Sequence, residues 1–311
     1  MGGTWGAEPP KGGSNLTRMR FGLVGTGHWA RVTHAPAIAA TAGAELVGVW
    51  GRRPEAVRPI AEEHDARAYD NFEALLDDVD AVAFSVPPHV QAPLATQAAR
   101  AGKHLLLDKP IALSRDDSDA LADAVATAGV ASVVFFTSRF VPEVRAWLAD
   151  VNTTSDWDGA TAHWLGDTFG EGSPYADSQW RRDKGGLWDL APHILSIVMA
   201  VLGPVDRVTS ERGPRDTTNL LVHHASGATT VATVSVEAPT AATAMDVMVW
   251  GARGRSWMPP GFDAPPAALG VALGELMAVA ESGQVEHPCD VRFGRDIVNV
   301  LAAAAEQLVN R

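Results

Sequence analysis

Short apolar runs and Ala-rich helical stretches alternate along the first part of the chain, between residues 21 and 138. Uninterrupted apolar strands separated by helices are typical of a parallel sheet with helices on both faces. The pattern predicts strands at residues 21–24, 45–50, 81–86, 104–107 and 130–136, with helices between them. We therefore expect residues 21–138 to form an α/β domain around a parallel sheet.

Beyond residue 139 the strand-like runs follow one another with little helix between them. Strands are predicted at residues 160–165, 217–224, 228–236 and 245–250, with a hairpin turn at Ala225-Ser226-Gly227. One long apolar helix is predicted at residues 187–202 and another helix at residues 295–309. Consecutive strands favour an antiparallel sheet, so residues 139–290 are expected to form an α+β domain. Residues 291–311 are expected to form a C-terminal helix that packs back on the first domain.

Composition and charge narrow the class of protein. The formal net charge of the 311 residues is −12, which argues against a nucleic-acid surface because such surfaces cluster Lys and Arg. No apolar run reaches the roughly 18–20 residues that span a bilayer, so no membrane partner is expected. Cys289 is the only cysteine, which fits a reducing compartment, and we expect a cytoplasmic protein. Residues 1–20 are rich in Gly and Pro and are interpreted as a flexible tail, not a secretory signal.

A glycine-rich turn, Gly25-Thr26-Gly27-His28-Trp29-Ala30, follows the first predicted strand and opens a helix. In a dinucleotide-binding turn the first glycine permits the sharp bend, the second lets the backbone approach the pyrophosphate, and the third position needs only a small residue. The second strand ends at Gly51-Arg52-Arg53, with no acid before Glu55. Arginines can bind a 2′-phosphate that a carboxylate would repel, so NADP(H) is favoured. NAD(H) stays open if these arginines are solvated loop charges.

Two further motifs carry candidate chemistry. Lys109 lies just past the predicted strand at residues 104–107, at the sheet edge where ligands bind in open α/β folds, and Pro110 restrains it. Taken alone, Lys109 also fits an ordinary surface lysine. Asp189 and His193 are four residues apart in an apolar stretch and would share one face of the predicted helix. Buried polar groups need partners, so these two either satisfy each other as a structural pair or serve a site.

In this order the motifs resemble the glucose–fructose oxidoreductase/inositol dehydrogenase (GFO/IDH/MocA) family. The segments that carry the resemblance are Gly25–Ala30, Val86-Pro87-Pro88, Gly102–Pro110, Arg139–Pro142, Trp180-Arg181, Gly185–His193, Trp250–Gly254 and Phe293-Gly294. The resemblance implies a Rossmann domain followed by an α+β domain with a mostly antiparallel open sheet. It implies hydride transfer between a nicotinamide cofactor and a carbon that bears a hydroxyl, commonly on a sugar or cyclitol. It also implies a homodimer or homotetramer formed through the second sheet.

The resemblance further implies residue roles. Lys109 matches the lysine of the family's Glu-Lys-Pro motif, with Asp108 in place of its Glu, while Asp189 and His193 match the family's catalytic pair. His193 would take the hydroxyl proton and Lys109 would stabilise the developing alkoxide. The expected cofactor contacts are Gly25, Thr26, Gly27, His28, Trp29, Gly51, Arg52, Arg53, Val86, Pro87, Pro88, His89, Asp108 and Lys109. The expected substrate contacts are Lys109, Trp180, Arg181, Asp189 and His193. A histidine that commonly follows the family's Pro-Pro pair is Gln91 here, and no metal-ligand spacing is found.

Two other functions stay open at this point. An enzyme that keeps its cofactor bound could use transient oxidation to drive an elimination, such as glycoside cleavage. A dinucleotide-sensing regulator could retain the fold without catalysis, although Lys109, Asp189 and His193 argue against it. Net turnover of free NADPH distinguishes a dehydrogenase from both.

Overall fold

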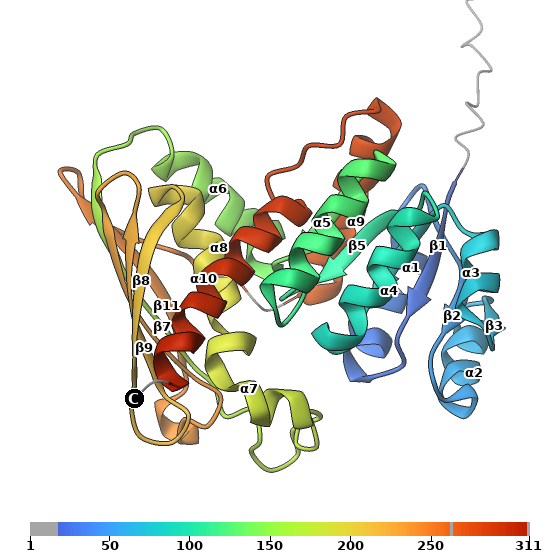
Figure 1. Ribbon diagram of the computed structural model, residues 1–311, viewed down its shortest axis with the longest axis horizontal. Coiled ribbons are helices and arrows are strands. Elements are labelled where there is room, and N and C mark those ends of the chain that lie inside the picture. Colours follow the sequence, from blue (N-terminus) through green and yellow to red (C-terminus); the bar gives the residue numbers. More distant parts are fainter. Residues whose placement is uncertain (1–17, 262–263, 310–311) are drawn as a thin grey trace, which may run out of the picture.

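The computed structural model describes residues 18–261 and 264–309, which form two sheets standing side by side (Figure 1). The predicted N-terminal tail lies outside the described residues as far as residue 17, and the first strand begins at Met19 instead of residue 21. Buried apolar side chains from both halves of the chain form one continuous cluster. The two sheets are therefore parts of one packed body.

The first sheet is parallel throughout, with strand order β3-β2-β1-β4-β5-β6. Its strands are β1 Met19–Val24, β2 Ala44–Trp50, β3 Arg67–Tyr69, β4 Ala81–Phe84, β5 His104–Asp108 and β6 Ser132–Phe135. The predicted α/β class and parallel sheet are confirmed, whereas β3 has one buried residue and is too short for the apolar pattern to indicate. The strand order reverses between β1 and β4, which opens a crevice at the carboxyl ends of the strands.

Helices connect the strands of the first sheet and pack against it. They are η1 Ala30–His34, a π-helical turn, then α1 Ala35–Ala40, α2 Pro54–Glu63, α3 Phe72–Asp78, α4 Pro88–Arg100 and α5 Arg115–Ala128. Local sequence explains where α3 and α5 begin. The side chains of Asn71 and Ser114 cap these helices by accepting hydrogen bonds from the N–H groups of Ala74 and Asp117, respectively. Gly129 ends α5 in the left-handed conformation.

The second sheet has strand order β12-β11-β7-β10-β9-β8, and only β7 and β10 pair in parallel. Its strands are β7 Trp157–Leu165, β8 Val205–Arg212, β9 Thr218–His224, β10 Thr229–Ser235, β11 Ala244–Gly251 and β12 Gly254–Trp257. The chain reaches it through η2 Thr137–Phe140 and α6 Pro142–Val151, and η3 Thr240–Ala242 precedes β11. The predicted antiparallel sheet and the β9–β10 hairpin are confirmed. The edge strands β8 and β12 were not predicted, because both are largely polar and exposed.

The predicted helix at residues 187–202 is present, with one turn residue, Leu190, between helix α7, Gln179–Asp189, and helix α8, Ala191–Leu202. The backbone of Leu190 stays in the helical region, whereas Gly185, with φ 63° and ψ −167°, kinks α7 before the predicted helix begins. Pro192, which lacks an N–H group, sits in the first turn of α8 and favours a helix start there. Asp189 is therefore the last residue of α7, and His193 lies in the first turn of α8. The stretch Gln179–Leu202 is long and apolar enough to span a membrane, but 83% of its apolar window is buried, as in a core helix.

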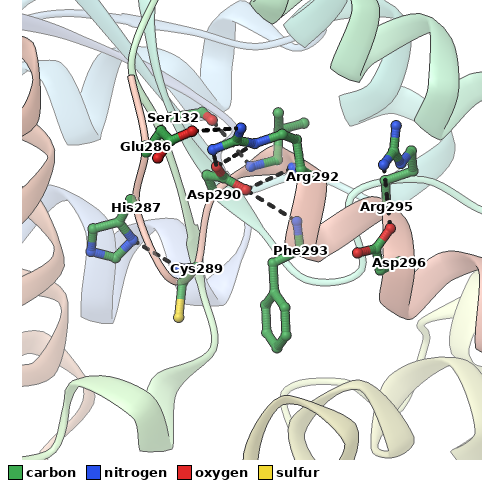
Figure 2. Close-up of polar contacts among 10 residues, drawn as sticks. Ser132, Glu286, His287, Cys289, Asp290, Arg292, Phe293, Arg295 and Asp296 are labelled. Atoms are coloured by element: carbon green, nitrogen blue, oxygen red, sulfur yellow. Dashed lines mark hydrogen bonds and ion pairs between the residues drawn. The ribbon is translucent and has the colours of Figure 1, made fainter. Parts of the chain in front are cut away.

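The last two helices return to the first sheet. Helix α9, Pro265–Ser282, packs against α1, β5 and β6, and the sequence pattern did not predict it. Helix α10, Val291–Val309, lies between α5 and β8 and so contacts both halves (red in Figure 1). The loop between them covers the edge of β6, because the N–H of Val134 donates to the carbonyl of Cys289 at 2.7 Å. Asp290 then caps α10 by accepting from the N–H groups of Arg292 and Phe293 (Figure 2).

Candidate active site

A cavity of about 710 Å³ opens at the carboxyl ends of β1, β4 and β5, against α7 and the start of α8. The predicted site residues that line it are Gly27, His28, Trp29, Arg52, Arg53, Val86, Pro87, Pro88, His89, Asp108, Lys109, Trp180, Arg181, Asp189 and His193. The remaining predicted residues, Gly25, Thr26 and Gly51, line an adjoining cavity of about 430 Å³ that shares Arg52 and Arg53 with the first. The fold thus brings every residue singled out in the sequence to one edge of the first sheet.

Asp189 joins two cations in this cavity. The ammonium of Lys109 donates to Asp189 Oδ1 at 3.0 Å and to the Asp189 backbone oxygen at 2.6 Å. The Nε of Arg181 donates to the other carboxylate oxygen, Oδ2, at 3.0 Å. Burial opposes the charge of Asp189, but Lys109 and Arg181 outweigh it and hold the pKa of this carboxyl below its usual value. Asp189 is therefore ionised at neutral pH and fixes the position of the lysine ammonium.

His193 lies in the first turn of α8 and is 4% exposed. Its imidazole packs against the indole of Trp164, with ring centroids 4.6 Å apart and planes inclined by 33°. Burial, reinforced by the positive charge of Lys109, holds the pKa of His193 well below its usual value. The ring is consequently neutral at physiological pH, which is the form that accepts a proton. Trp164 falls inside the strand predicted at residues 160–165, where no local sequence signal indicates a place in the site.

Gln91 supports the strand end that presents Lys109. Its buried amide accepts from the N–H of Asp108 at 2.8 Å and donates to the carbonyl of Asp108 at 2.8 Å. The sequence marks Gln91 only as a departure from the family pattern. In the structure its amide holds the backbone of Asp108. The fully buried His34 was also missed, and its Nε2 lies 3.7 Å from Asp108 Oδ2. The sequence alone does not pair Gln91 or His34 with Asp108, because both contacts depend on how α4 and η1 pack on β5.

Arg181 is held by its neighbours as well as by Asp189. Its guanidinium lies 4.3 Å from the ring centre of Tyr175 and 4.6 Å from that of Trp180, and Nη1 donates to Ser178 Oγ at 3.2 Å. The ring of Tyr175 also meets His28 of the glycine-rich turn edge-on, with centroids 5.8 Å apart. The segment before α7 therefore reaches across the cavity to the opposite wall.

The glycine-rich turn has the shape that a dinucleotide requires. Gly25 has φ +128°, and a Cβ there would lie 2.2 Å from the carbonyl oxygen of Ser85. A Cβ on Gly27 would meet no atom within 4 Å, so the backbone here is open to a ligand. The exposed Arg52 and Arg53 line the adjoining cavity, at the end of β2. The residues present fit an NAD(P) molecule whose pyrophosphate lies on this turn.

Among the residues that the structure describes, no group of three or more His, Cys, Asp or Glu side chains could hold a metal ion. Lys109, Asp189 and His193 line the cavity beside the place for a nicotinamide.

Comparison with known proteins agrees with this picture. Residues 19–136 match the GFO_IDH_MocA family model, described as an oxidoreductase family with an NAD-binding Rossmann fold. The chain is 37% identical over 106 residues to UDP-N-acetylglucosamine 3-dehydrogenase of Acidithiobacillus ferrooxidans, covering 34% of this chain and 33% of the relative. It is 29% identical over 225 residues to inositol 2-dehydrogenase of Rhizobium meliloti, covering 67% of this chain and 66% of the relative.

The likeness of fold extends further than the likeness of sequence. The crystal structure of GenD2 from gentamicin A biosynthesis, solved in complex with NAD, matches with a TM-score of 0.82 at 20% identity. That match covers 98% of each chain. The two sequence matches, in contrast, span one third and just under two thirds of the relatives' own lengths.

Proposed function

We propose that the chain, whose residues 19–136 match the GFO/IDH/MocA oxidoreductase family, transfers a hydride between a nicotinamide cofactor and a hydroxyl-bearing carbon of a sugar, cyclitol or related small polyol. The two sequence relatives, a UDP-sugar dehydrogenase and an inositol dehydrogenase, support this class of substrate. The single observation that carries the proposal is the juxtaposition of the Lys109 ammonium, bound to Asp189, with a buried neutral His193 in the same cavity.

Each of these side chains has a role in alcohol oxidation. A bound nicotinamide would supply the hydride acceptor. His193 takes the hydroxyl proton as the hydride leaves, and in the reverse direction it returns that proton. The Lys109 ammonium stabilises the negative charge that develops on the substrate oxygen. Asp189 holds the ammonium in place at the cavity, while Arg181 restrains the second oxygen of Asp189.

A substrate panel tests the reaction. Purified protein is mixed with NADP⁺ or NAD⁺ and a series of sugars, cyclitols and sugar nucleotides, and NAD(P)H is followed by absorbance. Lys109→Ala and His193→Ala are each expected to lower turnover at least about a hundredfold, since each removes a group that acts in the transition state. Cofactor affinity should stay close to that of the wild type. Lys184→Ala, which changes an exposed lysine outside the cavity, is the matched control.

The outcomes separate the possible functions. Near-wild-type turnover in either site variant would reject the assignment of that residue. Product formation without net change in NADPH would indicate a cofactor-retaining elimination. Tight NADPH binding with no turnover across the panel would indicate a regulator.

We propose NADP(H) as the preferred cofactor. The support is the position of Arg52 and Arg53, which follow β2 and line the adjoining cavity, and the absence of an acidic residue between β2 and Glu55. Two charge-assisted hydrogen bonds to a 2′-phosphate, at about 1.5–3 kcal/mol each, predict a loss of at least tenfold in NADPH affinity for the double variant Arg52→Ala/Arg53→Ala. NADH affinity should change little. Equal effects on NADPH and NADH, measured by fluorescence titration, would contradict the preference.

The outer face of the second sheet is proposed to join subunits. Register pairing places Leu221, Val231, Thr161, Met248 and Trp257 in one row across five strands. Leu221, Val231 and Trp257 are 39%, 51% and 57% exposed. Three exposed apolar side chains in one row favour an interaction surface, and a homodimer or homotetramer would cover it. Val231→Glu should give monomers in light scattering, and a wild type that is monomeric at all concentrations would refute the proposal.

The cytoplasm is the proposed location. Free nicotinamide cofactors are available there, and a reducing environment keeps a free thiol such as that of Cys289 reduced. Fractionation of the native source, followed by immunodetection, tests this location.

A further inference from the structure

The inner face of β7 changes from small to large side chains as it approaches the cavity. Ala160, Ala162 and Trp164 alternate along this face, and the two alanines are buried. Small side chains let α8 pack closely against the sheet. Trp164 comes next on the same face, in register with Val234 on one side and Met245 on the other. Its indole therefore lies where α8 begins, against the ring of His193.

This contact covers one face of the imidazole. The ring centroids are 4.6 Å apart and the planes are inclined by 33°, so the two rings pack in a tilted arrangement. Trp164 is half-buried, His193 is 4% exposed, and both line the cavity. The indole thus covers one side of the imidazole. Water that would hydrate an imidazolium is excluded from that side.

The charges around His193 come from Lys109, which directly follows β5, and from Asp189 and Arg181 on α7. Lys109 disfavours a second positive charge nearby. The charge of Asp189 is shared between Lys109 and Arg181, which bind its two carboxylate oxygens. Desolvation is the largest influence on the ring, and the indole of Trp164 is in direct contact with the imidazole.

Two effects of an indole on a histidine oppose each other. Cation–π attraction would favour the protonated ring, by an amount equivalent to about 1.5 pH units for a desolvated pair worth about 2 kcal/mol. Full burial disfavours the protonated ring by up to about 3–5 pH units. The second effect is the larger one for a ring as buried as His193.

We propose that Trp164 is a positioning residue that keeps His193 neutral and aligned as the proton acceptor of the site. The role of His193 as a base rests on the proposed function, but the protonation state of its ring does not. A neutral ring favours alcohol oxidation at neutral pH, and the reductive direction should speed up as the pH falls. No covalent step of Trp164 itself is involved.

Direct titration of the ring tests the proposal without any substrate. The full chain is labelled with ¹³C-histidine, the His193 signal is assigned by its loss in His193→Asn, and chemical shifts are followed by NMR against pH. In the wild type the midpoint should lie below the usual 6.5. In Trp164→Ala it should move up toward that usual value, because water reaches the ring. Trp164→Phe, which keeps a ring in place, should stay close to the wild type.

Two further variants keep the outcome decisive. Trp164→Gln retains bulk but brings polar atoms, so it should raise the midpoint even if the alanine variant folds poorly. Trp147→Ala makes the same deletion at an indole on α6 that does not line the cavity, and it should leave the midpoint unchanged. An unchanged midpoint in both Trp164→Ala and Trp164→Gln, or a wild-type midpoint near 6.5, would overturn the proposal.

Kinetics supply the second readout. A histidine of pKa 6.5 is about nine-tenths protonated at pH 5.5, so Trp164→Ala should lose about tenfold in kcat/KM there relative to its value at pH 8. The wild type should lose less over the same interval. If no substrate is oxidised at all, the proposed function fails while the NMR result still decides the role of Trp164.

Discussion

Replacing Asp189 by asparagine isolates the ion pair at the centre of the site. The change preserves shape but removes the negative charge that Lys109 and Arg181 share. Asp189 is 5% exposed, and the side chains of its two partners are 11% and 21% exposed. Two partly buried cations would then face each other without a counter-charge.

The magnitude follows from that burial. Removing one partner of a buried ion pair costs about 3–5 kcal/mol in the free energy of unfolding, because the remaining charge stays buried. Lys109 keeps its hydrogen bond to the backbone oxygen of residue 189, and both cations retain some exposure, so we expect about 2–3 kcal/mol. Loss of lysine alignment should also lower kcat about a hundredfold.

Urea unfolding followed by far-UV circular dichroism measures the stability change. Asp177→Asn is the matched control, because Asp177 is exposed on the same cavity and none of the described residues forms a salt bridge with it. Equal unfolding midpoints for Asp189→Asn and Asp177→Asn would refute the reasoning. So would wild-type turnover in Asp189→Asn.

Three other outcomes are expected. Because the pKa of Asp189 is lowered in the folded protein, its stabilising effect is complete above the usual value of 3.8 and is lost as the pH falls through the folded-state value. The difference in free energy of unfolding between wild type and Asp189→Asn should therefore shrink below about pH 4. A difference that stays constant with pH would contradict this prediction. Gly25→Ala should weaken NADPH binding at least about a hundredfold in a fluorescence titration, because its Cβ would lie 2.2 Å from the Ser85 oxygen, and unchanged affinity would show that the turn moves freely. Gln91→Leu leaves the N–H and carbonyl of Asp108 without their amide partner and should destabilise the fold by about 2–3 kcal/mol in urea; a neutral effect would mean that water replaces the amide.

Much of the first domain could be predicted from the sequence because its signals are local. An uninterrupted apolar run next to a glycine-rich turn specifies both a strand and the bend that follows it, as at Gly25. Lys109 could be placed at the ligand-binding edge for a similar reason, since the carboxyl ends of parallel strands share one edge of the sheet.

The parts that escaped prediction depend on contacts between distant segments. Gln91 binds Asp108 across 17 residues, and Trp164 meets His193 only because β7 and α8 pack together. A tryptophan at the end of a strand is more often simple core packing, so its type alone indicates nothing. The break at Leu190 escaped for a different reason, because an apolar run continues through it and hides the turn between α7 and α8.

The return of α9 and α10 to the first sheet has a consequence for domain exchange between relatives. A fragment that stopped at the end of β6 would leave the contact surface of α9 on β5 and β6 bare, together with the β6 edge that Cys289 now covers. A chimera that swaps the cofactor half of this chain for that of a relative therefore needs two grafts, one before residue 139 and one after residue 264. A relative's cofactor preference could pass to this chain by recombination only if both segments, the one before residue 139 and the one after residue 264, were exchanged together. The evolution of the C-terminal helices is therefore coupled to that of the glycine-rich turn.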